Sequence, residues 1–156
     1  MIVLTNSNSF LQEWIAINDE NYNELLLRKN YTFGVLYQQP LQSSESEIFG
    51  NIGHCQRFDH FLSLLGEFTT NSRDDNLCFH VNKAYQDFSL KFYVSTLLPH
   101  SKTNSQQLAR KSRIGNCCVS IVFQSGPALF SPEIITSQFL HVYIVVQPLE
   151  EQGRFQ

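Results

Sequence analysis

The sequence predicts an α/β (α+β) fold in which helices flank a mixed central β-sheet. Short runs rich in β-branched and aromatic residues indicate strands, one stretch has the apolar spacing of a helix, and the two kinds of segment are mixed along the chain. The chain has 156 residues, of which 42% are hydrophobic and 13% are aromatic. This length and composition allow one buried core and argue against two full domains.

In the first half of the chain, one segment has a clear helical pattern. We expect one or two irregular helices within residues 10–27, a short apolar strand at 33–37 and a polar loop at 39–54. Gly66 stands where a helix cap is favoured. It follows four apolar residues spaced along one helical face: Phe58, Phe61, Leu62 and Leu65.

The middle of the chain indicates a β-hairpin. Residues 69–76 have the composition of a turn-rich linker. Strands are expected at 77–81 and 88–96, joined through residues 82–87. Pro99 then ends the second strand.

A further helix and two strands complete the predicted sheet. Asn104 or Ser105 can cap a helix that extends through about Lys111. Strands are expected at residues 118–124 and 139–147, separated by a loop or by a short helix that begins at Pro132.

The segment 110–124, with the sequence RKSRIGNCCVSIVFQ, is the most informative part of the chain. A basic run leads through Ile-Gly to Asn116 and then to an apolar strand. Gly115 permits backbone angles that other residues avoid, so we expect Asn116 at a turn on the exposed edge of a rigid sheet. Functional residues are often found in such loops.

Charge and cysteine content argue against several classes of protein. The formal net charge of −3 provides no field that would attract nucleic acid. Arg110, Lys111 and Arg113 form a local positive patch that suits a protein partner or a phosphate as well as a solvated helix end. The cysteine spacing suggests neither zinc nor disulfides, and no apolar run approaches the roughly 20 residues of a membrane helix. We expect a cytoplasmic protein without a metal site, which reaches membranes only through a partner.

Several blocks occur in one order that resembles a known family. They are Thr32-Phe-Gly-Val-Leu-Tyr-Gln38, Gln42-Ser-Ser-Glu-Ser-Glu-Ile-Phe49, Phe58-Asp-His-Phe-Leu-Ser-Leu-Leu-Gly66, Tyr93-Val-Ser-Thr-Leu-Leu-Pro99, the segment around Asn116, and Phe139-Leu-His-Val-Tyr-Ile-Val-Val-Gln147. Together they resemble the GTPase-activating domain of the Rap GTPase-activating proteins, which are more distantly related to tuberin and the Ral GTPase-activating proteins.

The resemblance implies that the chain accelerates GTP hydrolysis on a small GTPase of the Rap/Ras family. Asn116 matches the family's catalytic asparagine, which is inserted into the partner's nucleotide site. The partner would hold GTP and Mg²⁺, so the chain would need no cofactor and would catalyse no independent reaction. Arg110, Lys111, Arg113 and Gly115 match the catalytic helix, where they would engage the GTPase or support the helix.

The chain departs from the family pattern near Asn116. Ser112 and Arg113 stand where relatives usually have Arg-His, Cys117 replaces an Asp, and Tyr93 stands where a His often occurs. The changes at Ser112, Arg113 and Cys117, and the shortened C-terminal end, favour an alternative in which a catalytically weak module still binds a GTPase or another partner.

Cysteine chemistry is another alternative. A thiol enzyme would use Cys117 or Cys118 with His100 or His141, although cysteines in strands are usually inert.

The resemblance also divides the chain. Residues 31–147 correspond to the Rap-GAP-like domain, residues 1–30 to an N-terminal segment of uncertain structure and residues 148–156 to a tail. The family's C-terminal Phe-Gly-Pro-Pro block is missing, so the predicted fold is shortened at that end. The family's dimerisation region is not recognisable in residues 1–30, and no homodimer is predicted.

Overall fold

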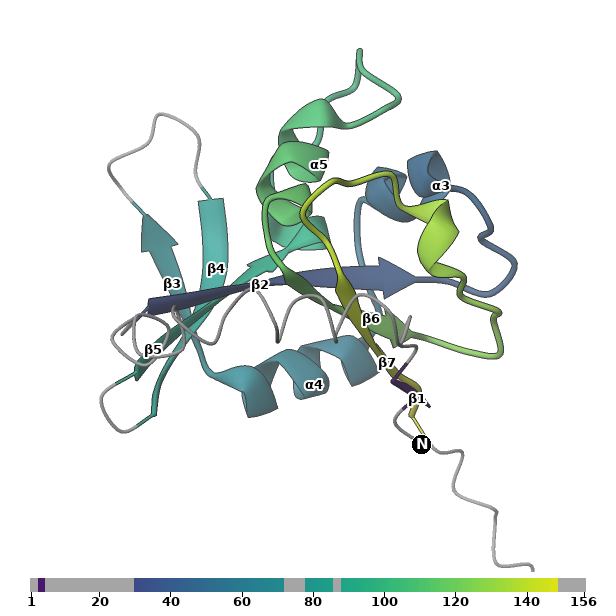
Figure 1. Ribbon diagram of the computed structural model, residues 1–156. Coiled ribbons are helices and arrows are strands. Elements are labelled where there is room, and N and C mark those ends of the chain that lie inside the picture. The colour runs from purple at the N-terminus through teal and green to yellow at the C-terminus, as the bar shows by residue number, and fades with distance from the viewer. Residues whose placement is uncertain (1–2, 5–29, 72–77, 86–87, 149–156) are drawn as a thin grey trace, which may run out of the picture.

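A mixed seven-stranded sheet lies at the centre of the protein, with helices on both of its faces (Figure 1). The computed structural model describes residues 3–4, 30–71, 78–85 and 88–148. Within these residues the strand order is β1-β7-β6-β2-β5-β4-β3. The predicted fold class is therefore confirmed. The helices expected at residues 10–27 lie outside the described residues, as does the predicted tail apart from Pro148.

Four neighbouring strands run parallel. β2 pairs with β5 on one side and with β6 on the other, and β6 pairs with β7. β1 adds antiparallel to β7 at one edge, while β4 and then β3 add antiparallel at the other. The strands are β1 (Val3–Leu4), β2 (Asn30–Gln38), β3 (Glu67–Asn71), β4 (Cys78–Tyr85), β5 (Phe88–Val94), β6 (Val119–Gln124) and β7 (Val142–Val146).

Alternating side chains of β2 separate the core into two clusters. Leu36 belongs to the cluster that includes buried residues of α3 (Glu45–Gly50) and α5 (Leu108–Gly115). Val35 and Tyr37 belong to the cluster that contains α4 (Gln56–Leu65). Since successive strand residues point to opposite faces, α3 and α5 cover one face of the sheet and α4 covers the other, as Figure 1 shows.

The helix predicted from apolar spacing is α4, and the prediction is confirmed. Phe58 and Leu62 are fully buried. The Phe58 ring lies 5.0 Å from the ring centroids of both Tyr37 and Phe123, so α4 packs across β2 and β6. The N–H of Gly66 donates to the Leu62 carbonyl at 3.3 Å and ends the helix.

The expected loop at residues 39–54 is wrong in its centre, where α3 forms. Ser44 and Glu47 make a capping box, in which the Ser44 hydroxyl accepts from the Glu47 N–H and the Glu47 carboxylate accepts from the Ser44 N–H. Hydrogen bonds from the N–H groups and hydroxyl of this turn, the Ser43 N–H first, lower the pKa of Glu47. The six-residue helix is too short for the i, i+3, i+4, i+7 pattern of apolar residues, but its Ile48 and Phe49 are buried.

The hairpin region contains more strand than the sequence predicts. Thr69, Thr70 and Asn71, expected in a linker, belong to β3, and β4 continues to Tyr85. Both strands are defined by hydrogen bonds to neighbouring strands, which local composition does not show. β5 ends at Val94, and the last two residues of the predicted strand, 95 and 96, belong to a 3₁₀ turn, η1 (Ser95–Leu97).

α5 starts later and ends later than predicted. Gln107, with φ of 49°, precedes the helix in a left-handed conformation, and the Asn104 side chain accepts from the Gln106 N–H within the preceding loop. The proposed caps at Asn104 and Ser105 are therefore wrong. The short helix expected at Pro132 is present as η2 (Pro132–Ile134).

Gly34 lets α5 approach β2 closely. A Cβ at this position would lie 2.7 Å from Cγ2 of Ile114 and 3.0 Å from Oγ of Ser120. We expect Gly34→Ala to lower the free energy of unfolding by about 1–3 kcal/mol through overpacking, measured by urea denaturation. Gly50→Ala is the matched control, because a Cβ there would have no neighbour within 4 Å. Equal stability of the two variants would contradict this account of the packing.

Candidate functional site

Asn116 occupies the turn between α5 and β6. Asn116 is the C-terminal cap of α5, with φ of −87° and ψ of −1°, and it is exposed to solvent. The N–H of Cys117 donates to the Ile114 carbonyl at 3.0 Å, and both of these residues are buried. An exposed carboxamide therefore stands on a turn whose flanking residues are packed into the core. This is the location that the sequence predicts.

Gly115 has a different role from the one expected. It is the last residue of α5, and no glycine in the described residues lies in the left-handed region of backbone angles. A Cβ at Gly115 would make an ordinary contact of 3.6 Å with Oγ of Ser137. The prediction that glycine supplies unusual backbone angles here is wrong, because the helix continues through Gly115 in its regular conformation.

Arg110 on α5 is buried, with only 1% of its surface exposed. Its guanidinium donates to the carbonyls of Leu98, Pro99, Phe49 and Asn51 at distances of 2.6–3.2 Å. Burial lowers the pKa of Arg110, but arginine remains charged in proteins. Of the two roles expected for this residue, its position suits support of the helix and not contact with a partner.

Lys111 is paired with Glu45 across the gap between α5 and α3. Its Nζ donates to Oε2 of Glu45 at 2.7 Å, and the two side chains are 28% and 24% exposed. Oε1 of Glu45 accepts from the Thr136 N–H at 2.9 Å. Burial, with a smaller contribution from the Glu45 charge, raises the pKa of nearby Tyr143 to about 12. Glu45 thus connects two helices with the loop before β7.

Arg113 is the exposed member of the basic run. Its Cζ lies 6.0 Å from the centroid of the Tyr93 ring, and Nζ of Lys91 lies 5.2 Å from the same centroid. The predicted patch of Arg110, Lys111 and Arg113 does not form as a unit, because Arg110 is buried and Lys111 is ion-paired. Exposed positive charge at this end of α5 comes from Arg113.

Ser137 contacts the end of α5 and was not singled out by the sequence. Its hydroxyl donates to the Gly115 carbonyl at 2.7 Å and accepts from the N–H groups of Phe139 and Leu140 at 3.1 Å each. Ser137 lies 22 residues from Gly115, and no local pattern marks a contact at that separation. Glu45 was missed as well, although the capping box that begins at Ser44 could have placed it at the start of a helix.

The cysteines beside Asn116 have contrasting surroundings. Cys117 is buried, and burial raises the pKa of its thiol to about 11, the reverse of what an activated nucleophile needs. Cys118 is exposed. The His100 ring contacts the Gln107 side chain at 3.2 Å. The geometry gives no support to a thiol enzyme that uses Cys117.

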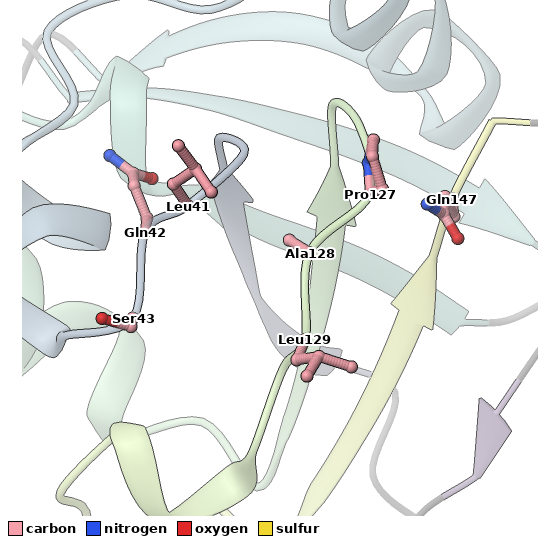
Figure 2. A pocket seen from close by; sticks show the side chains of 7 residues that line it. All are labelled: Leu41, Gln42, Ser43, Pro127, Ala128, Leu129 and Gln147. Atoms are coloured by element: carbon pink, nitrogen blue, oxygen red, sulfur yellow. The ribbon is translucent and has the colours of Figure 1, made fainter.

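A pocket of about 550 Å³ lies beyond the C-terminal ends of β2, β6 and β7 (Figure 2). Its walls are the loops that follow β2 and β6, together with Gln147 after β7. Leu41 and Leu129 on these walls are 93% and 94% exposed, and Leu41 has a left-handed φ of 67°. β2, β6 and β7 are parallel, so their C-terminal ends lie on the same side of the sheet. Asn116 precedes the N-terminal end of β6. The length of β6 therefore separates Asn116 from the pocket, and the pocket is not part of the Asn116 site.

Buried glutamines hold the loops around the pocket. Nε2 of Gln124 donates to Oε1 of Gln38 and to the Ala128 carbonyl, at 2.9 Å each. Nε2 of Gln38 donates to the carbonyls of Gln42 and Leu129 at 2.9 and 3.3 Å. These amides connect the two loops to the ends of β2 and β6.

Both ring nitrogens of His54 have hydrogen-bonding partners. Its ring nitrogens lie 2.7 Å from Oγ1 of Thr96 and 2.8 Å from Oδ1 of Asp59. Within the described ranges no group of three or more histidine, cysteine or acidic side chains is placed to hold a metal ion. In the same part of the chain, no helix has the length and apolar character needed to cross a bilayer.

Comparisons with known proteins identify the class of domain. The sequence profile of the Rap/ran-GAP family matches residues 48–156. Human signal-induced proliferation-associated 1-like protein 3 is 39% identical over 153 residues, covering 85% of this chain and 9% of that protein. Human GTPase-activating Rap/Ran-GAP domain-like protein 3 is 37% identical over 142 residues, covering 81% of this chain and 14% of that protein.

A solved structure supports the same assignment. The structure of the TSC2 GAP domain superimposes with a TM-score of 0.71 at 25% identity, covering 80% of this chain and 72% of that chain. The chain belongs to the Rap/ran-GAP family, and the resemblance noted from its sequence is confirmed. It spans only 9% and 14% of the length of the two human relatives.

Arg110 should be important for stability. We expect Arg110→Met to lower the free energy of unfolding by about 3 kcal/mol or more, because four backbone carbonyls, three of them in buried hydrogen bonds, lose a charged donor. Arg57→Met, on the exposed surface of α4, should change it by less than about 0.5 kcal/mol. Urea denaturation of both variants measures the difference. If Arg110→Met were as stable as the wild type, the guanidinium would not be what holds these segments together.

Thiol labelling should separate the two adjacent cysteines. From its pKa alone, Cys117 should react with iodoacetamide about 100-fold more slowly in the folded protein than in urea at neutral pH. Exposed Cys118 should change little, and peptide mass mapping distinguishes the two. Rapid labelling of folded Cys117 at neutral pH would instead indicate an activated thiol.

Folding favours the neutral Cys117 thiol, so the stability of the protein should also depend on pH. The contribution of this thiol to stability should be complete below about pH 9 and disappear as the pH rises through about 11.

Proposed function

We propose that this domain stimulates GTP hydrolysis by a small GTPase and that it does so by inserting Asn116 into the partner's nucleotide site. The observation that carries the proposal is the exposed Asn116 carboxamide at the end of a braced helix. Membership of the Rap/ran-GAP family supports a GTPase-activating role, as do the printed names of relatives such as GTPase-activating Rap/Ran-GAP domain-like protein 3.

The carboxamide suits this task chemically. It has two N–H donors and a carbonyl acceptor on a short side chain, so it can orient the attacking water and contact a phosphoryl oxygen. It stays neutral across the physiological pH range. Catalysis of phosphoryl transfer depends mainly on positioning and electrostatic stabilisation, so one well-held residue supplied in trans can have a large effect.

The surroundings of Asn116 indicate which of the other site residues would support α5 and which would contact the partner. Arg110 is buried and Lys111 is ion-paired with Glu45, so both would support α5. Arg113 is exposed three residues before Asn116, so its charge would contact the partner. GTP and Mg²⁺ would be held by the GTPase, and the domain would need no cofactor of its own. A Rap-type GTPase is the proposed partner.

Single-turnover hydrolysis of GTP preloaded on Rap-type and other Ras-family GTPases tests the proposal. The wild-type domain should accelerate hydrolysis, and Asn116→Ala should lose about 10³-fold or more of that acceleration. Asn116→Asp should also lose it, because a carboxylate keeps the size of the side chain but has no N–H donor and is repelled by phosphate.

Gln106→Ala provides a matched control. It removes another exposed carboxamide just before α5, near the end opposite Asn116, and should keep the wild-type rate. If folded wild-type protein accelerated no GTPase, the catalytic proposal would fail. GTPase binding by the same protein would then favour the catalytically weak interaction module.

A further inference from the structure

We propose that Ser137 and Glu45 are positioning residues that hold the Asn116 turn in place. The inference rests on the proposed function of Asn116 and extends it to two residues that would not touch the nucleotide. Both connect α5 to the loop between η2 and β7. Glu45 does so through Lys111, and Ser137 does so through Gly115, one helical turn further along α5.

The Ser137 hydroxyl acts directly on the peptide that carries Asn116. It donates at 2.7 Å to the Gly115 carbonyl, which belongs to the peptide unit joining Gly115 to Asn116. The same oxygen accepts from the N–H groups of Phe139 and Leu140. A hydroxyl has one hydrogen and two lone pairs, so all of its bonding capacity is used and its orientation is fixed.

This restraint matters because of where it acts. The last carbonyls of a helix have no partner within the helix, and glycine has more backbone freedom than any other residue. Without Ser137, the Gly115 carbonyl would have to find a partner in solvent, and the Gly115–Asn116 peptide could reorient. The hydroxyl therefore supplies at this position the partner that the helix itself cannot provide.

Glu45 keeps Ser137 within reach of α5. One carboxylate oxygen accepts from Lys111 Nζ at 2.7 Å, and the other accepts from the Thr136 N–H at 2.9 Å. The chain of contacts thus leaves α5 at Lys111, passes through Glu45, Thr136 and Ser137, and returns to α5 at Gly115. A closed ring of this kind restrains the loop and the helix end together.

The loop is also anchored on both sides of the ring. Ile135 and Leu140 are 5% and 7% exposed and belong to the same core cluster as Ile114 of α5. The hydrogen-bonding residues Thr136 and Ser137 lie between these two anchors. Loss of the hydrogen bonds made by Thr136 and Ser137 should therefore loosen the turn locally, while the packed core stays in place.

The kinetic test compares Ser137→Ala with Ser137→Thr, using GTP-loaded Rap-type GTPase as substrate. Misplacement of a catalytic group lowers its effect without changing the docking surface, so Ser137→Ala should reduce kcat roughly 10- to 100-fold and change KM by less than about twofold. Ser137→Thr keeps the hydroxyl and should restore most of kcat. Glu45→Gln, which loses the charge pair with Lys111, should also lower kcat with KM nearly unchanged.

Ser63→Ala is the matched control. The Ser63 hydroxyl donates to the His60 carbonyl at 2.6 Å, but it lies on α4, on the opposite face of the sheet. Its loss should leave kcat and KM unchanged. A Ser137→Ala variant with wild-type kcat would overturn the proposal, and so would a Ser137→Thr variant as slow as Ser137→Ala.

Amide hydrogen exchange of the free protein separates failure of this inference from failure of the proposed function. Ser137→Ala should speed exchange at Cys117, Phe139 and Leu140 and leave α4 unchanged. If the wild type activated no GTPase, the proposed function would fail, and faster exchange at Cys117 would still show that Ser137 restrains the turn. Unchanged exchange at Cys117 would overturn the restraint whatever the activity.

Discussion

The buried guanidinium of Arg110 is the interaction on which the geometry of the site depends. Taking a charge out of water costs several kcal/mol unless it is well satisfied, and here five hydrogen bonds to four carbonyls offset that cost. Phe49 and Asn51 lie at the C-terminal end of α3, where the helix dipole is negative, and Leu98 and Pro99 follow η1. One side chain therefore fixes α5 against two segments that are far apart in sequence.

The parallel strands place the two notable surface features at opposite edges of the sheet. α5 connects the C-terminal end of β5 to the N-terminal end of β6, so the residue that ends the helix must lie beside the N-terminal ends of the parallel strands. The apolar pocket is formed by loops at the C-terminal ends of these strands. A search that began from this pocket would miss Asn116, whose proposed chemistry takes place in a partner's cleft and requires exposure.

The sequence predicted best the features that depend on local pattern. The apolar spacing of α4 and the strand runs of β2 and β6 follow from side chains a few residues apart, and the turn at Asn116 follows from the break between a helix and a strand. α3 was missed because six residues are too few for the i, i+3, i+4, i+7 pattern of apolar residues. β3 and the full length of β4 were missed because hydrogen bonds to neighbouring strands define these segments, and local composition does not show such bonds. The start of α5 was misplaced because Gln107, and not Asn104 or Ser105, precedes the helix.

By itself, the sequence determined the fold class, the family resemblance and the place of Asn116 in the chain, because each depends on the order and spacing of residue types. Only the tertiary structure decided what the neighbouring side chains do. Arg110, Lys111 and Arg113 are similar charges in sequence, yet one is buried, one is ion-paired and one is exposed. The Ser137 contact with Gly115 likewise exists only in the folded chain. Burial and hydrogen bonding between distant segments set these roles, and no local pattern encodes them.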